Sequence, residues 1–147
     1  MFRAKTVLVA VDFSETSEKA IETAIEVAAK FDGRVVLLHA YEIPALGFPD
    51  GVLVASSDVV SRIGTAAQTA LADLTDKYRG RVPLETLLRM GPAYETVNAV
   101  AEELGADLIV IGTHGRKGLA RALLGSVAEN IIRTATRPVI VLHGPRD

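Results

Sequence analysis

One stretch of the sequence concentrates residues that suit the binding of an anion. It runs Gly112-Thr-His-Gly-Arg-Lys-Gly-Leu-Ala-Arg-Ala-Leu-Leu-Gly-Ser126, with four glycines, three cations and no carboxylate. We expect Gly112 and Gly115 to adopt positive φ and expose backbone N–H groups, which bind anions when they follow one another in a turn. Gly125 and Ser126 open a predicted helix, whose unpaired N–H groups and dipole favour a phosphate. A turn and a helix start joined by Arg116, Lys117 and Arg121 suit a polyphosphate.

Other nucleotide chemistries fit the sequence less well. The chain contains neither G-x-x-x-x-G-K-[ST] nor G-x-G-x-x-G, which argues against P-loop ATPases and dinucleotide dehydrogenases. Asp12, His114 and Ser126 have the residue types of a hydrolytic triad, but Ser126 lacks the G-x-S-x-G elbow that exposes a nucleophile. No residue stands out as a base for water attack on a γ-phosphate, so fast ATP turnover is not predicted.

The elements that would position these residues alternate between strand and helix. Near-continuous apolar runs predict five parallel strands, at 6–11, 34–40, 84–89, 107–111 and 138–142, with the third nearer an edge. Apolar residues at helical spacing predict helices over 21–31, 60–78, 97–104 and 127–135, with Ser14 as the first cap and Pro92 in a first turn.

This alternation predicts an α/β fold with a doubly wound, open parallel sheet and helices on both faces, because parallel crossovers are right-handed. The pattern allows the strand order 3-2-1-4-5 or the related flavodoxin-like order. In such a sheet the carboxyl ends of strands one and four lie side by side, so Asp12 and Gly112 should flank one crevice. The segment from Glu42 to Ser57, rich in proline and glycine, is predicted as a loop long enough for a lid or a partner-contacting flap.

Composition limits the class of protein. The length of 147 residues suits a single domain, 1–147, and a formal charge of −2 gives no general attraction to nucleic acid or anionic membranes. The absence of cysteine excludes disulfides and thiolate metal sites and fits a reducing compartment. The apolar run after Lys5 is too short for a signal peptide or a membrane span, so we expect a cytoplasmic protein.

The three histidines are dispersed and do not suggest a metal site within the protein. His39, at the end of a core strand, is predicted to be a hydrogen-bonded structural residue, and His143 follows the last strand. A metal ion would therefore be Mg²⁺, or Mn²⁺, carried by the phosphates of a nucleotide.

The glycine spacing G-x2-G-x9-G-[ST], from Gly112 to Ser126, resembles the nucleotide signature of the universal stress protein family, in its single-domain, ATP-binding type. Four further segments carry the resemblance over the whole length: Val-Ala-Val-Asp-Phe-Ser, Leu-Leu-His-Ala, Ala-Asp-Leu-Ile-Val-Ile-Gly-Thr-His-Gly-Arg and Arg-Pro-Val-Ile-Val-Leu. The resemblance implies the adenine-nucleotide-hydrolase-like strand order 3-2-1-4-5. It also implies a homodimer, and the apolar edge strand from Pro138 to Leu142 is where two copies could pair.

The resemblance also implies roles for single residues. Asp12 would accept hydrogen bonds from the ribose hydroxyls, and Ala10, Val11 and Ala40 would border the adenine, although relatives often have a small polar residue where this chain has Val11. The residues expected around the phosphates are Gly112, His114, Gly115, Arg116, Gly125, Ser126 and Val127.

Three functions remain open on the sequence. The first is an ATP-binding regulatory protein of the stress response that signals through shape. The second is an enzyme, either a slow ATP hydrolase or an adenylate-forming relative, although Val11-Asp12-Phe13-Ser14 lacks the glycine-serine loop expected of the latter. The third is a ligand-free dimeric scaffold, against which the intact glycine signature counts.

Overall fold

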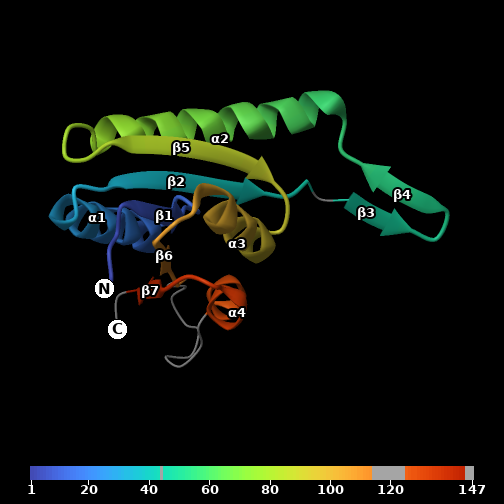
Figure 1. The fold of residues 1–147 in the computed structure, drawn as a ribbon. Helices are drawn as coiled ribbons and strands as arrows, with labels where there is room; N and C mark the ends of the chain where they lie inside the picture. Colours follow the sequence, from blue (N-terminus) through green and yellow to red (C-terminus); the bar gives the residue numbers. More distant parts are fainter. Residues whose placement is uncertain (44, 114–124, 145–147) are drawn as a thin grey trace.

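The computed structural model describes residues 1–43, 45–113 and 125–144 (Figure 1). In chain order its elements are β1 Thr6–Ala10, α1 Glu15–Lys30, β2 Arg34–Tyr41, β3 Ala45–Phe48, β4 Gly51–Val54, α2 Ser57–Lys77, β5 Leu84–Met90, α3 Ala93–Leu104, β6 Leu108–Gly112, α4 Ser126–Thr134 and β7 Val139–Leu142. The five predicted sheet strands and four predicted helices are all present, with ends that differ by a few residues.

The main sheet has the order β5-β2-β1-β6-β7, and each neighbouring pair is parallel. Counted over these five strands alone, this is the predicted order 3-2-1-4-5. β5 lies at one edge, as expected from its mixed composition, and β7 lies at the other. The winding reverses at β1, which pairs with β2 on one side and β6 on the other.

The sheet has a hydrophobic core on each face, because successive side chains of a strand point to opposite sides. In β1, Val7 and Val9 pack with α1 and α2, whereas Leu8 between them packs with α3 and α4. Figure 1 shows the two helix pairs on opposite faces of the sheet. Coverage of both faces explains why the strands are almost continuously apolar.

The helices begin at the residues that their local chemistry favours. The Ser14 hydroxyl accepts a hydrogen bond from the backbone N–H of Ser17 at 3.1 Å, which confirms it as the cap of α1. Pro92 precedes α3 as its N-cap, one position earlier than a first-turn proline. α3 ends at Gly105 in the left-handed conformation, with φ of 61°, which glycine adopts at little cost.

Each helix turns one apolar stripe to the sheet and leaves charged residues outside. α1, for example, buries Ala20, Ile21 and Ala24 while Glu22 and Lys19 are exposed. None of the helices in the described part of the chain is long and apolar enough to cross a membrane.

The segment predicted as the loop from Glu42 to Ser57 contains a second, two-stranded sheet. β3 and β4 pair antiparallel, from Ala45 with Val54 to Phe48 with Gly51, around a two-residue turn at Pro49 and Asp50. The preset negative φ of proline suits the first central position of a type I or II turn. Figure 1 shows this hairpin projecting from the body of the protein beyond the ends of β2 and β5.

Two isoleucines on different helices test the packing of the core. Ile21 is fully buried between α1 and the sheet, whereas Ile132 on α4 is 44% exposed. Ile21→Ala should lower the free energy of unfolding by about 2–5 kcal/mol through lost burial and a residual cavity. Ile132→Ala, the matched control, should change it by no more than about 0.5 kcal/mol. Urea denaturation measures both, and equal losses would contradict the assignment of the core.

Candidate functional site

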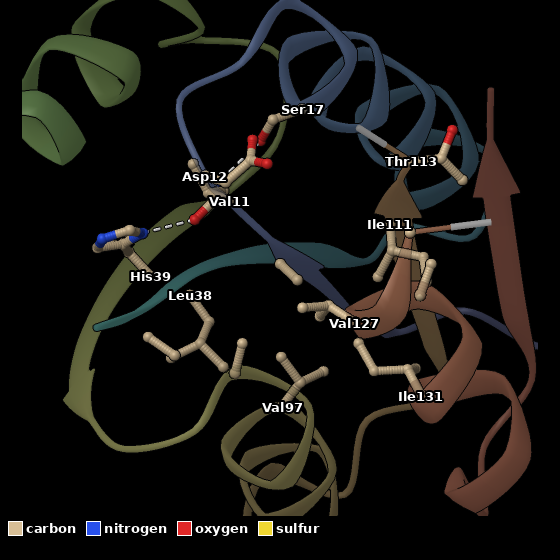
Figure 2. Close-up of a pocket in the computed structure, with 16 residues that line it drawn as sticks. Val11, Asp12, Ser17, Leu38, His39, Val97, Ile111, Thr113, Val127 and Ile131 are labelled. Atoms are coloured by element: carbon tan, nitrogen blue, oxygen red, sulfur yellow. Dashed lines mark hydrogen bonds between the residues drawn. The ribbon is translucent and has the colours of Figure 1, made fainter. Parts of the chain in front are cut away.

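A cavity of about 110 Å³ opens at the carboxyl ends of β1 and β6, where the winding of the sheet reverses (Figure 2). This is several times the space that one water molecule needs. Its lining comes from three strands, three helices and residues next to their ends: Ala10, Val11, Asp12, Ser17, Leu38, His39, Ala40, Ala93, Val97, Ile111, Gly112, Thr113, Gly125, Val127, Ala128 and Ile131. The crevice predicted between strands one and four is therefore present.

Most of the predicted site residues with described positions line this cavity. They are Ala10, Val11, Asp12, Ala40, Gly112, Gly125 and Val127. Ser126 is the first residue of α4 and is exposed, adjacent to two of the lining residues. His114, Gly115 and Arg116 lie outside the described residues, as do Lys117 and Arg121, so their predicted roles stay predictions.

The interior of the cavity is apolar. Figure 2 shows Leu38 from β2, Val97 from α3 and Val127 and Ile131 from α4 converging on one space, with Ile111 of β6 beside them. Leu38 and Ile131 have no exposed surface, and Val97 has almost none. Such a surface attracts the apolar faces of a ligand, while groups at the edge fix its orientation.

The polar edge is built around Asp12, directly after β1. Its Oδ1 atom accepts hydrogen bonds from the backbone N–H of Ser14 at 3.0 Å and from the Ser14 hydroxyl at 2.5 Å. Its own N–H donates to the buried Ser17 hydroxyl at 3.2 Å. Because Ser14 is the helix cap, Asp12 is not itself the cap of α1; it fixes the capping residue and places an exposed carboxylate at the cavity.

His39 closes the same edge from β2. Its Nδ1 atom lies 2.6 Å from the carbonyl oxygen of Val11, and since a carbonyl only accepts, Nδ1 carries the proton (Figure 2). This bond confirms the prediction of a hydrogen-bonded histidine. The Phe13 ring packs against His39 with centroids 4.6 Å apart, although Phe13 has φ of 64°. A bulky residue rarely adopts this backbone conformation, and such strain concentrates at functional sites.

Gly112 meets a different requirement from the one predicted. It is the last residue of β6 and is not among the described glycines with positive φ, so the prediction of a left-handed turn there is wrong. A Cβ atom at Gly112 would lie 2.7 Å from the Thr16 Cγ2 atom and 2.9 Å from the Thr16 carbonyl oxygen. The glycine lets the first turn of α1 approach β6, so a larger side chain there would disturb the fold as well as the site.

α4 presents its N-terminus to the cavity. Gly125 is the N-cap and has no side chain to bond the first N–H groups, and the carbonyl of Gly125 accepts from Glu129 as the helix begins. The first N–H groups of a helix have no partners within it, and they carry the positive end of its dipole. The predicted start of the last helix at Gly125 and Ser126 is confirmed, and its position beside the cavity suits an anionic group.

Several lining residues were not predicted. Ser17 lies one turn after the predicted cap Ser14, so the helical repeat alone could have placed it beside Asp12. Ala93 and Val97 belong to the first turns of α3. This helix begins just after the carboxyl end of β5, so its first turns lie at the same end of the sheet as the cavity. Thr113 is buried and donates its backbone N–H to the carbonyl of Leu142 at 2.8 Å, a partner that only the pairing of β6 with β7 reveals.

The described side chains form no ready-made site for a metal ion. Within residues 1–43, 45–113 and 125–144, no three His, Asp or Glu side chains are grouped as ligands for an ion. Asp12 is the one carboxylate among the cavity residues described. A cation at this edge would thus need further oxygen ligands, which the phosphates of a nucleotide would supply.

The family profile and the most similar curated proteins indicate the same protein family. A sequence profile of the universal stress protein family matches residues 3–143. Universal stress protein MJ0531 of Methanocaldococcus jannaschii is 35% identical over 144 residues, which cover 97% of this chain and 84% of that protein.

Solved structures show the same fold. The structure of MJ0577, also from Methanocaldococcus jannaschii, matches with a TM-score of 0.80 at 23% identity and covers 98% of this chain and 99% of its own. A universal stress protein in complex with cAMP has a TM-score of 0.73 at 27% identity, with 97% and 99% covered. The universal stress protein from Archaeoglobus fulgidus in complex with dAMP has a TM-score of 0.63 at 22% identity, with 96% and 97% covered.

Two glycine substitutions test the close approach of α1 to β6. Gly112→Ala should lower the free energy of unfolding by about 1–3 kcal/mol, because the new methyl group overlaps Thr16. Gly64→Ala in α2 is the control: its Cβ atom would lie 3.6 Å from the Tyr41 hydroxyl, an ordinary contact, and should stabilise the helix by about 0.5–1 kcal/mol. Thermal and urea unfolding measure both. A neutral Gly112→Ala would show that α1 can withdraw from β6 without cost.

Proposed function

We propose, from the premise that this chain belongs to the universal stress protein family, that it binds an adenine nucleotide in the cavity between β1 and β6. We take ATP to be the ligand and nucleotide-dependent regulation in the stress response to be the role. The observation that carries the proposal is the meeting, in one cavity, of an apolar slot, a carboxylate and a helix N-terminus.

Each part of this arrangement suits a different part of a nucleotide. The slot formed by Leu38, Val97 and Val127 accepts the flat, apolar faces of a base. The Asp12 carboxylate lies at the edge of the slot, where its oxygens can accept from ribose hydroxyls. The start of α4 offers N–H groups and a positive dipole to phosphates. The solved family members that carry cAMP and dAMP support an adenine nucleotide as the class of ligand.

ATP is favoured over shorter nucleotides by the cations of the glycine-rich segment. Three cations lie in the sequence between Gly112 and Ser126, and both ends of this segment line or adjoin the cavity. A triphosphate would interact with more of these charges than a monophosphate would. Mg²⁺ bound to the phosphates would neutralise part of their charge. Asp12, the one carboxylate among the described cavity residues, could supply an oxygen ligand to this ion.

The described polar groups favour binding over turnover. Asp12 accepts from Ser14, and His39 uses Nδ1 to hold the carbonyl of Val11, so both side chains with suitable proton chemistry have structural partners. A general base must reach the water molecule that it activates. A protein built this way would report the presence of nucleotide through its conformation, because a ligand shifts an equilibrium between states that it binds unequally.

We further propose that two copies pair through β7. The carbonyls of Pro138 and Leu142 accept hydrogen bonds from the N–H groups of Ile109 in β6 and of Thr113 directly after it, and main-chain groups alternate in a parallel ladder. The N–H and C=O groups of Val139 and Val141 therefore point away from β6, along the edge of the sheet. β7 carries no charged residue to discourage pairing, and antiparallel pairing across a two-fold axis would satisfy its edge.

The first test compares Asp12→Asn with Asp73→Asn. Asparagine keeps an Oδ1 acceptor for Ser14 but loses the charge and one acceptor oxygen, so affinity for ATP and for AMP should fall by a similar factor, on the order of tenfold or more. Asp73 is exposed on α2 and its variant should bind like the parent protein. Titration calorimetry on nucleotide-free protein gives both affinities.

The same titrations decide between nucleotides. The parent protein should bind ATP more tightly than AMP, and an excess of about a hundred times the dissociation constant should stabilise the fold by about 2.7 kcal/mol. If no adenine nucleotide raises the unfolding temperature of nucleotide-free protein, the proposed function is wrong. Release of phosphate at a rate that Asp12→Asn abolishes would instead indicate an enzyme.

The second test blocks the edge of β7. Val141→Pro removes an N–H that points away from β6 and leaves the ladder to β6 intact, so it should halve the mass of the particle in solution. Val141→Ala keeps the N–H and should retain the mass of the parent protein. Sedimentation equilibrium at micromolar concentration measures all three proteins, and an unchanged mass for Val141→Pro would exclude β7 as the interface.

A further inference from the structure

The β3–β4 hairpin lacks the support that an isolated hairpin needs. The two strands form a sheet of their own and pair only with each other among the described residues. Figure 1 shows them extending away from both helical layers. A lone two-stranded hairpin is at best marginally stable in water and usually requires a third strand or a packed surface.

The hairpin also concentrates exposed apolar side chains. Phe48, Val52, Leu53 and Val54 are 57–66% exposed, and β4 shows all of its residues to solvent. Val59 at the start of α2 and Met90 at the end of β5 extend this surface, since Met90 pairs in register with Tyr41 beside the base of the hairpin. Six of the ten exposed large apolar side chains in the described part of the chain thus gather at one corner.

Of the two outer edges, that of β4 is the more suited to pairing. β4 contains no proline and no charged residue, so each of its residues has an N–H group and nothing on the strand repels a neighbour. β3 is followed at once by Pro49, which has no N–H. Natural sheet edges are normally protected by charges, prolines or a covering element, and the described residues place none of these on β4.

We infer that a second copy of this chain covers the hairpin, with β4 of each copy paired antiparallel across a two-fold axis. Centred on Leu53, this register places Leu53 of one copy opposite Leu53 of the other, and Val52 opposite Val54. The apolar run is therefore complementary to itself. The result is a four-stranded sheet in which each hairpin gains the additional strand that it lacks.

The surface available matches a second copy better than a charged partner. The hairpin segment from Ala45 to Val54 holds Asp50 as its single charged residue, at the turn, so nothing on β4 selects an ionic surface. Each copy would contribute Val52, Leu53 and Val54, which are 60–66% exposed, so that pairing removes part of their apolar surface from water. Reciprocal use of one patch is the rule for two-fold dimers.

This contact is separate from the proposed interface at β7. The hairpin leaves from β2, next to β5, whereas β7 forms the opposite edge of the sheet. The two contacts can exist in one assembly, and neither depends on bound nucleotide. Their tests therefore fail or succeed independently.

Cysteine substitution gives a direct test, because the chain contains no cysteine of its own. Opposed residues of an antiparallel pair have Cβ atoms about 4.5–5.5 Å apart, close to the spacing of a disulfide. Under mild oxidation of the otherwise unmodified chain, Leu53→Cys should form a covalent dimer at least about tenfold faster than Ala72→Cys, an exposed control on α2. Val52→Cys mixed with Val54→Cys should form a mixed dimer faster than either variant alone.

A charge at the centre of the edge gives the second readout. Leu53→Lys should halve the sedimentation mass at micromolar concentration, while Ala72→Lys leaves the mass unchanged and both variants keep the circular dichroism spectrum of the parent. Combined with Val141→Pro, Leu53→Lys should give the mass of one chain. Equal oxidation rates for Leu53→Cys and Ala72→Cys, or an unaltered mass for Leu53→Lys, would exclude a second copy as the occupant of this surface.

Discussion

The pairing of β1 with β6 is the contact on which the rest of the site depends. These strands align from Val7 with Leu108 to Val9 with Val110. After β1 the chain turns into α1, on one face of the sheet; after β6 it continues toward α4, on the other face. Because these helices lie on opposite faces, the winding reverses between β1 and β6, and a crevice opens at the ends of the two strands. The site follows from this reversal, and its chemistry from the residues that the two strand ends carry.

A small network of hydrogen bonds maintains the edge of this crevice. His39 holds the carbonyl of Val11, Asp12 holds Ser14, and the Ser17 hydroxyl accepts from the N–H of Asp12. These bonds satisfy backbone groups that the end of a strand would otherwise leave unpaired. They also fix the direction in which the chain leaves β1, so that α1 can approach Gly112 closely. The same residues therefore determine the stability of the first turn of α1 and the geometry of the cavity. A substitution that alters one of these properties should alter the other.

The features that could be predicted from the sequence are those fixed by local patterns. Apolar runs located the sheet strands and the cap at Ser14 located the start of α1, because a strand or a helix end is determined by a few adjacent residues. The choice between two strand orders needed the family resemblance, since both orders produce the same alternation of elements. Gly112 was predicted to form a turn. Its actual role, the close contact with Thr16, could not be predicted because the two residues are far apart in the sequence. The hairpin was missed because its strands are short and Gly51–Val54 has three apolar residues in a row, so no alternation of apolar and polar residues marks it as a strand.

The distribution of charge over the strand edges connects the fold to its proposed assembly. β5, at one edge of the main sheet, carries Glu85 paired with Arg34 and Arg89 paired with Glu103. Charged side chains on an edge discourage pairing with another chain. β7 and β4 have no such residues, although each is an edge whose neighbour lies on one side alone. An open apolar edge favours aggregation unless another strand covers it. The two proposed contacts use the edges of β4 and β7, which are apolar and uncharged. Such edges expose an isolated chain to aggregation, whereas pairing with a second copy would cover them.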